Sequence, residues 1–364
     1  MSALQTFLRD GGKIEDLLAR FAIKATRHRK YPNLALFKYN QIESPFAEPI
    51  VQSARGCILD EADGWRHVSR PFDKFFNYGE GLAASIDWST AQVQEKVDGS
   101  LVCLFFYDGV WQVQTSGLPD AGGEVNGMKM SFAELFWQVF YEMELPFPTE
   151  EADRNHTFMF ELTTPYNRVV VQHRERRLTL LSIRNNETGK EYHPDIAPAY
   201  PAVRSFPLQS MADVEATLAT MKPMEQEGYV IVDAAFRRVK VKSPAYVAIH
   251  HMRDGFGPRR LVEVIRIGET SELLAHFPEW RPDFDAMQSK YDALVQTIET
   301  DYERFKDIPG QKEFALEAVK TVCSAALFQI RKGKVGSVRQ FLAEMHINRV
   351  LDLLHVRDVV PEEP

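Results

Sequence analysis

A single lysine stands in a setting that suits nucleophilic group transfer. The hexapeptide Glu-Lys-Val-Asp-Gly-Ser at residues 95–100 places Lys96 where one strand pattern ends and another begins. An amine attacks only when it is neutral, and at neutral pH roughly three pKa units, about 4 kcal/mol, separate a lysine from that state. Nearby cations and burial can offset this cost because they disfavour the ammonium form. We therefore expect other cations close to Lys96, and no salt bridge to it.

The tetrad Lys96–Gly99 also fits a plain strand that runs into an Asp-Gly turn. Average composition produces such a tetrad by chance in about one chain in ten of this length, so by itself it is weak evidence. The glycine would let a ligand approach the backbone closely. The decision depends on residues elsewhere in the chain.

Two carboxylates and two lysines follow in later strand-like segments. Glu161 interrupts an apolar run, Glu227 precedes another, and Lys240 and Lys242 lie in a third. Residues two apart on a strand share a face, so the two lysines point the same way. Lysines of this kind counter phosphate charge, while carboxylates bind ribose hydroxyls or hydrated magnesium. Taken singly these are ordinary surface residues, but their order and spacing after Lys96 favour a nucleotide site.

Strands must position these side chains, and alternating or continuous apolar residues predict them. Residues 34–113 are mainly strand-like, and Asp108-Gly109 is a turn signal that predicts a hairpin between Val102–Tyr107 and Val110–Val113. The further strands expected are Thr157–Leu162, Arg168–Gln172, Leu178–Ile183, Gly228–Val232 and Arg238–Lys242.

Helices are expected between and after these strands. Ser131 suits an N-cap with Glu134 at the reciprocal position of a capping box, so a helix is expected from there to Glu142. Two shorter helices are expected at Ile14–Ile23 and near Val214–Met221.

The pattern changes after about residue 250, where apolar residues take helical spacing with few strand signals. We expect one domain at residues 1–250 and an all-helical domain at residues 251–364. A basic turn, Ile330–Val335, suits either a solvated loop or a contact with an RNA phosphate. The helices expected in the second domain are Phe284–Phe305, Glu313–Ile330 and Val338–Val350.

The composition bounds the class of protein. At 364 residues the chain is too long for one ordinary core, and 45% hydrophobic with 26% charged residues is typical of a globular protein. The net charge of −8 argues against wholesale binding of a phosphate backbone but permits an enzyme that holds a few nucleotides. Three distant cysteines support neither a disulfide framework nor a zinc site, and Cys57 and Cys103 are expected to be buried, inert thiols.

In this order the motifs resemble those of the covalent nucleotidyltransferase superfamily, which comprises ATP-dependent DNA ligases, RNA ligases and mRNA capping enzymes. Lys96–Gly99 matches the nucleophile motif, Phe160-Glu161 the third, Glu227-Gly228 the fourth and Lys240–Lys242 the fifth. The chain looks most like the bacteriophage RNA ligase 1 family, over about residues 34–255. The stretches that point to this family are Ala54–Leu59, Ser69–Asn77, Asn167–Val171, Leu180–Asn185 and Lys242–Tyr246.

The resemblance implies an α+β fold, with a nucleotidyltransferase domain of antiparallel sheets flanked by helices and an all-helical C-terminal domain. It implies an ATP-dependent RNA ligase: Lys96 is adenylated, AMP passes to an RNA 5′-phosphate, and a 3′-hydroxyl then attacks and releases AMP. Magnesium or manganese is the expected metal. RNA ends are the expected partners, RNA repair is the expected setting, and no membrane is involved. The expected location is cytoplasmic, or the host cytoplasm if a phage encodes the chain.

The resemblance also assigns roles to particular residues. Arg55 and Lys74 would contact the β- and γ-phosphates, and Lys240 and Lys242 the α-phosphate. Glu161 would contact the ribose, and Glu227 would help to hold the metal through water. The full set expected to bind nucleotide is Arg55, Lys74, Asp98, Gly99, Glu161, Glu227, Lys240 and Lys242, with Glu161 and Glu227 as the candidate metal ligands.

The sequence departs from the family at two places. Val97 stands where the phage enzymes commonly have glutamate, outside the pattern shared by the superfamily. Thr115–Leu118 carries no basic residue where relatives often have one, which puts one phosphate or RNA contact in doubt.

Two rivals remain. A DNA ligase or capping enzyme shares the motifs but usually appends an oligonucleotide-binding barrel, which the helical tail disfavours. An RNA-end-binding module without activity is disfavoured because every charged motif position is retained.

Overall fold

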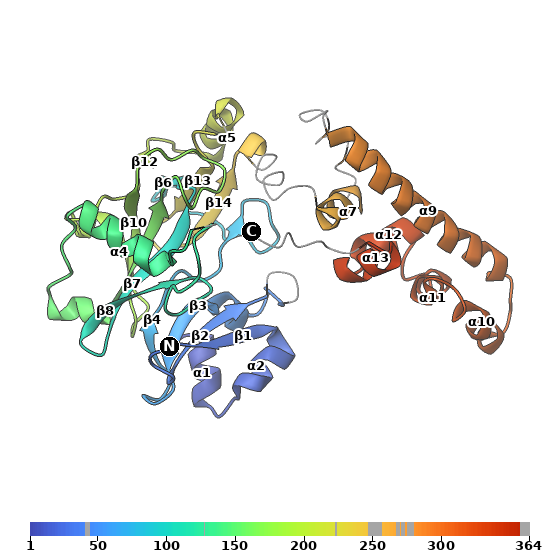
Figure 1. Ribbon diagram of the computed structural model, residues 1–364, viewed down its shortest axis with the longest axis horizontal. Coiled ribbons are helices and arrows are strands. Elements are labelled where there is room, and N and C mark those ends of the chain that lie inside the picture. The colour runs from blue at the N-terminus through green and yellow to red at the C-terminus, as the bar shows by residue number, and fades with distance from the viewer. Residues whose placement is uncertain are drawn as a thin grey trace. The chain divides into compact units, whose positions relative to one another are not determined.

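The chain forms two compact units in a computed structural model, Met1–His250 and His251–Pro364. The structure describes residues 1–40, 44–126, 128–222, 224–246, 257–266, 270, 274 and 280–356. The first unit combines three sheets with helices, and the described part of the second consists of helices (Figure 1). The expected α+β class is therefore confirmed. Within the described segments, no helix has the length and apolar character needed to cross a membrane.

The first sheet has the order β1-β2-β3-β4, and all its pairs are antiparallel. Helices near the N-terminus cover one of its faces, where Leu4, Leu8 and Leu17 pack against Phe37 and Leu59 (Figure 1). The elements are α1 (Ala3–Arg9), α2 (Ile14–Phe21), β1 (Ile23–Arg27), β2 (Leu34–Tyr39), α3 (Pro49–Ser53), β3 (Arg55–Asp60) and β4 (Arg66–Ser69).

The second sheet has the order β11-β10-β9-β7-β8, and helix α4 packs on it through Phe136, Val139 and Phe140. The expected hairpin is confirmed: Asp108 and Gly109 both have positive φ, as a type I′ turn requires. The expected capping box at the start of α4 is also confirmed. The elements are β7 (Ser100–Tyr107), β8 (Val110–Thr115), α4 (Phe132–Glu142), the 3₁₀ helix Glu151–Asn155, β9 (His156–Thr163), β10 (Arg177–Asn185) and β11 (Glu191–Tyr192).

The third sheet has the order β12-β6-β13-β14-β5. Its pairs are antiparallel, as expected, except for the short strand β5, which runs parallel to β14. Helix α5 packs on the sheet through Val214 and Leu218. The elements are β5 (Phe76–Asn77), β6 (Gln92–Lys96), the 3₁₀ helix Pro194–Ile196, β12 (Ser205–Phe206), α5 (Met211–Thr220), β13 (Gly228–Val232) and β14 (Arg238–Lys242).

One expected strand, Arg168–Gln172, is absent from the structure. The backbone N–H groups of Val170 and Val171 donate to the carboxylate of Asp98 instead of to a neighbouring strand. The backbone N–H groups of this apolar segment therefore bond to a side-chain carboxylate and not to another strand. The alternation of apolar residues does not reveal such a partner.

The second unit packs helices around a core that includes Phe284, Tyr291, Ile298, Phe314 and Leu327. Two expected helices are interrupted. Cys323 has a non-helical backbone between α10 and α11, and Met345 and His346 have extended ψ angles between α12 and α13, although the apolar spacing continues across both breaks. The described elements are α7 (Pro258–Arg266), α9 (Arg281–Phe305), α10 (Gln311–Ala318), α11 (Ser324–Arg331), α12 (Val338–Glu344) and α13 (Ile347–Leu353).

All three cysteines are buried and free, as expected for Cys57 and Cys103. Burial raises the pKa of each of these two thiols to about 12. Neither thiol is therefore a nucleophile at neutral pH.

Candidate active site

The register of the third sheet brings two distant lysines to one glutamate. Gly228 at the start of β13 pairs with Lys96 on β6 and with Lys242 on β14. Glu227 precedes Gly228, so its side chain lies between the two lysine-bearing strands. A Cβ at Gly228 would overlap the Val241 carbonyl oxygen, and only glycine therefore allows this close pairing.

Glu227 is an almost fully buried carboxylate shared by two ammonium groups. Its Oε2 lies 2.6 Å from Lys96 Nζ, and its Oε1 lies 2.9 Å from Lys242 Nζ. Only 2% of Glu227 is exposed, and a buried acidic side chain without such partners would be strongly destabilising. The expectation that Lys96 makes no salt bridge is wrong, because the register places this lysine within reach of the acid.

The predicted cations gather around Lys240. Burial and then the positive charges of Lys74, Lys242, Lys96 and Arg55 lower the pKa of Lys240 to about 8. Such an accumulation of positive charge is unfavourable without an anionic partner. It is well suited to a ligand that carries several negative charges, such as a triphosphate.

A cavity of about 260 Å³ opens beside Lys96. Among the predicted site residues, Arg55, Lys96, Gly99 and Glu161 line it. Apolar walls with a few charged groups are typical of small-molecule sites. The other lining residues are Phe72, Phe75, Gln94, Glu95, Val97, Leu101, Leu181, Val203, Val230 and Arg238.

Glu161 stands on β9, opposite Leu101 of β7. Its pKa is raised to about 8, mainly because burial disfavours the carboxylate; Lys96 opposes this shift, and the nearby Glu227 adds to it. At neutral pH the side chain is mostly protonated and can therefore donate a hydrogen bond as well as accept one.

Arg55 and Lys74 are held against aromatic rings. The Arg55 guanidinium lies 5.5 Å from the ring centre of Phe75, and its buried Nη1 has no hydrogen-bond partner. Lys74 Nζ lies over the rings of Phe46, Tyr39 and Phe76, at 4.7, 5.3 and 5.5 Å. In the described part of the chain neither cation forms an ion pair, so both can meet an anionic ligand.

Asp98 is directed away from the cavity, unlike its neighbours Val97 and Gly99. Its Oδ2 accepts the backbone N–H groups of Val170 and Val171 at 2.8 and 2.7 Å, and its Oδ1 accepts the Tyr246 hydroxyl at 2.7 Å. Both oxygens are thus occupied within the protein. The Asp98 carboxylate, which we had expected to contact the nucleotide, thus connects the loop after Lys96 to Val170, Val171 and Tyr246.

Gly99 owes its place to close packing. A Cβ at Gly99 would lie 2.5 Å from the Leu162 carbonyl oxygen and 2.9 Å from Thr163 Cγ2. The glycine therefore lets β9, and with it Glu161, approach the loop that carries Lys96.

Several residues that build the site were missed as functional residues. Tyr246, Phe72, Phe75 and Leu181 lie within the stretches that resemble the phage family, but aromatic and apolar residues in strands are typical of ordinary cores. Arg238 lines the cavity and is ion-paired to Glu191 at 2.7 Å. Nothing in its strand distinguishes it from a surface arginine.

The described residues contain no cluster of three or more histidine, cysteine, aspartate or glutamate side chains that could hold a metal by itself. The two expected metal ligands, Glu161 and Glu227, interact electrostatically. A pair of carboxylates suits a magnesium ion that keeps several waters and is completed by substrate phosphates.

A family model described as RNA ligase, of the T4 RNA ligase 1 type, matches residues 53–246. This match covers more than half of the chain and contains every predicted site residue. The chain belongs to this family of RNA ligases.

Proteins similar to the chain include two viral sequences and a solved archaeal structure. It is 27% identical over 335 residues to a protein of Autographa californica nuclear polyhedrosis virus inferred to be a bifunctional polynucleotide kinase/RNA ligase; the match covers 85% of this chain and 48% of that protein. The chain thus spans about half the length of this viral relative. It is 25% identical over 346 residues to an RNA ligase of Rhodothermus phage RM378, covering 77% and 78% of the two chains. An archaeal ATP-dependent RNA ligase gives a TM-score of 0.47 at 13% identity, over 78% of this chain and 77% of that one.

Proposed function

We propose that the protein is an ATP-dependent RNA ligase that joins 5′-phosphate and 3′-hydroxyl RNA ends through a covalent adenylate on Lys96, in RNA repair. The observation that carries the proposal is the position of Lys96. Its amine lines a cavity, shares a buried carboxylate with Lys242 and lies within a cluster of cations. Family membership supplies the class of substrate.

The first step is an attack by Lys96 Nζ on the α-phosphorus of ATP. A nitrogen–phosphorus bond forms, the bond to the β-phosphate oxygen breaks, and pyrophosphate leaves. Glu227 Oε2, which contacts the attacking amine, accepts the proton that the amine loses, and Lys240 and Lys242 offset the charge that develops on the α-phosphate. AMP then passes to the RNA 5′-phosphate, and the 3′-hydroxyl displaces it.

The cavity walls suggest where the nucleoside lies. Phe72, Phe75 and Leu181 provide apolar surface for a base, and Glu161 provides a carboxyl group for the ribose. The raised pKa of Glu161 favours a hydrogen bond to a hydroxyl over a metal contact. This division leaves Glu227 as the better candidate metal ligand.

Magnesium or manganese, when bound, would offset the charge of the phosphates. Glu227 suits the metal because its carboxylate is buried between two lysines and lies beside the attacking amine. The absence of a larger acidic cluster among the described residues agrees with a metal that takes most of its ligands from water and phosphate.

The two units have different roles in this proposal. Residues 1–250 form the adenylyltransferase domain with its N-terminal extension, and residues 251–364 form a helical domain that contributes to RNA choice. The second unit is helical wherever it is described, which favours an RNA ligase over the DNA ligases and capping enzymes that carry a barrel.

Self-adenylation in the presence of ATP and magnesium tests the proposal. Wild-type protein incubated with ATP labelled at the α-phosphate is expected to retain on a denaturing gel a label that is stable to alkali and is released by acid, as the nitrogen–phosphorus bond of a lysyl-adenylate requires. Lys96→Ala should take up none and fail to join 5′-phosphorylated RNA, yet join pre-adenylated RNA, because that substrate bypasses the first step. Lys320→Ala, at an exposed lysine of α10's C-terminal turn, is the matched control.

An unlabelled wild-type protein would instead support an RNA-end-binding module without activity. Label retained by Lys96→Ala would show that another residue is the nucleophile.

A further inference from the structure

Lys38, near the end of β2, faces the same side of the first sheet as Arg55. The two residues are paired across β2 and β3, just beyond a shift in register between Phe37 and Lys38. Lys38 also shares a β2 face with Leu34 and Leu36, and those two leucines pack around Phe105 of β7. Its side chain is therefore directed toward the β7–β8 hairpin.

The turn that follows β8 lies beside this lysine. Gly56, at the register shift, has φ +83°, and a Cβ there would lie 2.8 Å from the Ser116 carbonyl oxygen, so the missing side chain admits the turn. The Thr115 N–H donates to the Leu118 carbonyl oxygen and fixes the turn. A Cβ added at Gly117 would lie 3.5 Å from Lys38 Nζ and would meet no other atom within 4 Å.

Lys38 and Arg55 form a pair of adjacent cations. Burial and the charge of Arg55 lower the pKa of Lys38. Within the described residues neither cation has an ion-pair partner, and Arg55 Nη1 is buried without a hydrogen bond. Two cations held side by side repel each other, and a multiply charged anion would relieve this repulsion.

The cations continue from the cavity into the first sheet. Arg55 lines the same cavity as Lys96, and Lys38 is the cross-strand neighbour of Arg55. In a displacement at phosphorus the leaving group departs opposite the attacking atom. Arg55 and the neighbouring Lys38 are therefore candidates to meet a pyrophosphate that leaves the cavity opposite Lys96.

We propose that Lys38 binds the β- and γ-phosphates of ATP and stabilises the departing pyrophosphate. The inference rests on the proposed function, and it adds a residue from β2 to the site. The segment Thr115–Leu118 carries no cationic side chain, and Lys38 supplies a positive charge at the place that a side chain of this segment would occupy.

The test measures the rate of self-adenylation against ATP concentration in the full chain. Lys38→Ala and Lys38→Met, the second of which keeps the aliphatic stem, should each lower kcat/KM for ATP by about 10- to 100-fold. Added pyrophosphate should inhibit both variants more weakly than wild type. Joining of pre-adenylated RNA should stay within about twofold, because no pyrophosphate takes part in that step. Lys24→Ala is the matched control, since Lys24 is exposed and directly opposite Lys38 on β1.

A charge swap sharpens the test. In the double variant Lys38→Ala/Gly117→Lys, a lysine on the turn after β8 reaches the position that Lys38 Nζ occupied. Its kcat/KM for ATP should be at least about tenfold higher than that of Lys38→Ala. If the wild type forms the adenylate and Lys38→Met has an unchanged kcat/KM for ATP, the role of Lys38 is overturned and the proposed function still stands. An equal loss on pre-adenylated RNA would overturn it too, and would identify an RNA contact instead. No adenylate in the wild type would overturn the proposed function, and this inference with it.

Discussion

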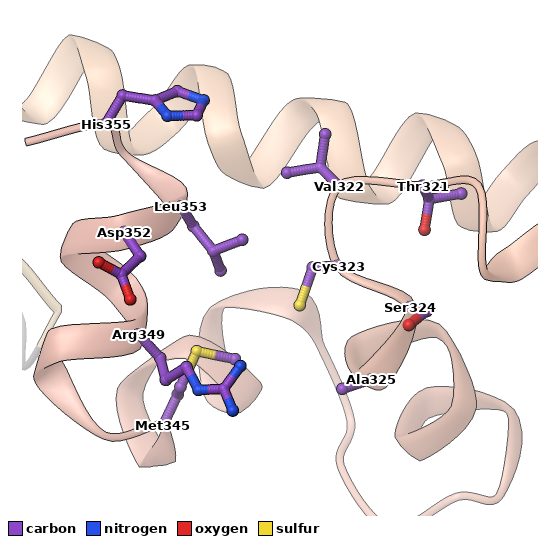
Figure 2. Close-up of a pocket in the computed structure, with 10 residues that line it drawn as sticks. All are labelled: Thr321, Val322, Cys323, Ser324, Ala325, Met345, Arg349, Asp352, Leu353 and His355. Atoms are coloured by element: carbon purple, nitrogen blue, oxygen red, sulfur yellow. The ribbon is translucent and has the colours of Figure 1, made fainter.

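Each of the two units contains a pocket, and the two units differ in how deeply their charged side chains are buried. The cavity of the first unit, about 260 Å³, gathers Arg55, Lys96 and Glu161 from different strands around buried ionic contacts. The pocket of the second unit is larger, about 480 Å³, with residues from the turn before α11 on one side and from α13 on the other (Figure 2). Size therefore does not identify the reactive site.

Burial of charge is what separates the two regions. Glu227 is 2% exposed and bridges two lysines, whereas the Lys320–Glu317 pair of the second unit, at 2.8 Å, is exposed to solvent. Exposed pairs contribute little to stability and perturb reactivity weakly. A sheet with fixed register can hold opposed charges in its interior, and this is the arrangement that group transfer requires.

Replacing the buried carboxylate of Glu227 by an amide should produce the largest difference in self-adenylation rate between variants of the two units. Glu227→Gln can neither accept the proton of the Lys96 amine nor help to hold the metal, so self-adenylation is expected to fall by at least about 100-fold. Arg349→Ala, in the pocket of the second unit, should leave the rate within about twofold. Rates are read from labelled adenylate at saturating ATP. Equal effects of the two variants would contradict the contrast drawn between the pockets.

Two buried tyrosines offer a matched pair with an intermediate effect. Tyr246 and Tyr291 are both 1% exposed, but the Tyr246 hydroxyl donates to Asp98, whereas the Tyr291 hydroxyl has no hydrogen-bond partner among the described residues. Tyr246→Phe should lower the free energy of unfolding by about 1–3 kcal/mol, because Asp98 loses a donor to its charge. Tyr291→Phe should change it by less than about 0.5 kcal/mol.

The same pair separates positioning from folding. Adenylation should slow in Tyr246→Phe under conditions where it is fully folded, because Asp98 holds the loop that carries Lys96. Urea denaturation and the labelling assay, run on both variants, make the comparison; an unaffected rate in Tyr246→Phe would remove Asp98 from the list of positioning residues.

The subtlest contrast concerns pH. The folded chain raises the pKa of Glu161 from 4.5 to about 8, so ionising this buried group costs stability as pH rises through that range. The free energy of unfolding of Glu161→Gln relative to wild type should therefore increase between pH 5 and pH 9, approximately. Glu313→Gln, on α10 of the second unit, should show no such trend. A constant difference for Glu161→Gln across this range would show that the carboxyl group is not desolvated.

Patterns of apolar residues predicted the elements that carry the site. Gly228–Val232 and Arg238–Lys242 are strands with the expected bounds, and the hairpin and the capping box of α4 formed as predicted. Each of these features depends on neighbours in the sequence. Local chemistry is enough to specify them.

Features that depend on partners distant in the sequence could not be predicted. No local pattern shows that Asp98 takes the amides of Val170 and Val171, or that Gly228 sets Lys96 and Lys242 on either side of Glu227. The salt bridge of Lys96 follows from that register. The apolar cavity walls and the place of Lys38 beside Gly117 also arise only once three sheets are assembled.

The position of the adenylate is the most direct test of the central claim. Wild-type protein incubated with ATP and magnesium can be digested and its peptides sequenced by mass spectrometry. The account predicts one adenylyl group on the peptide that contains Lys96, at its side-chain nitrogen. An adenylyl group on Lys240, whose pKa is lowered to about 8 by the surrounding cations, would contradict it.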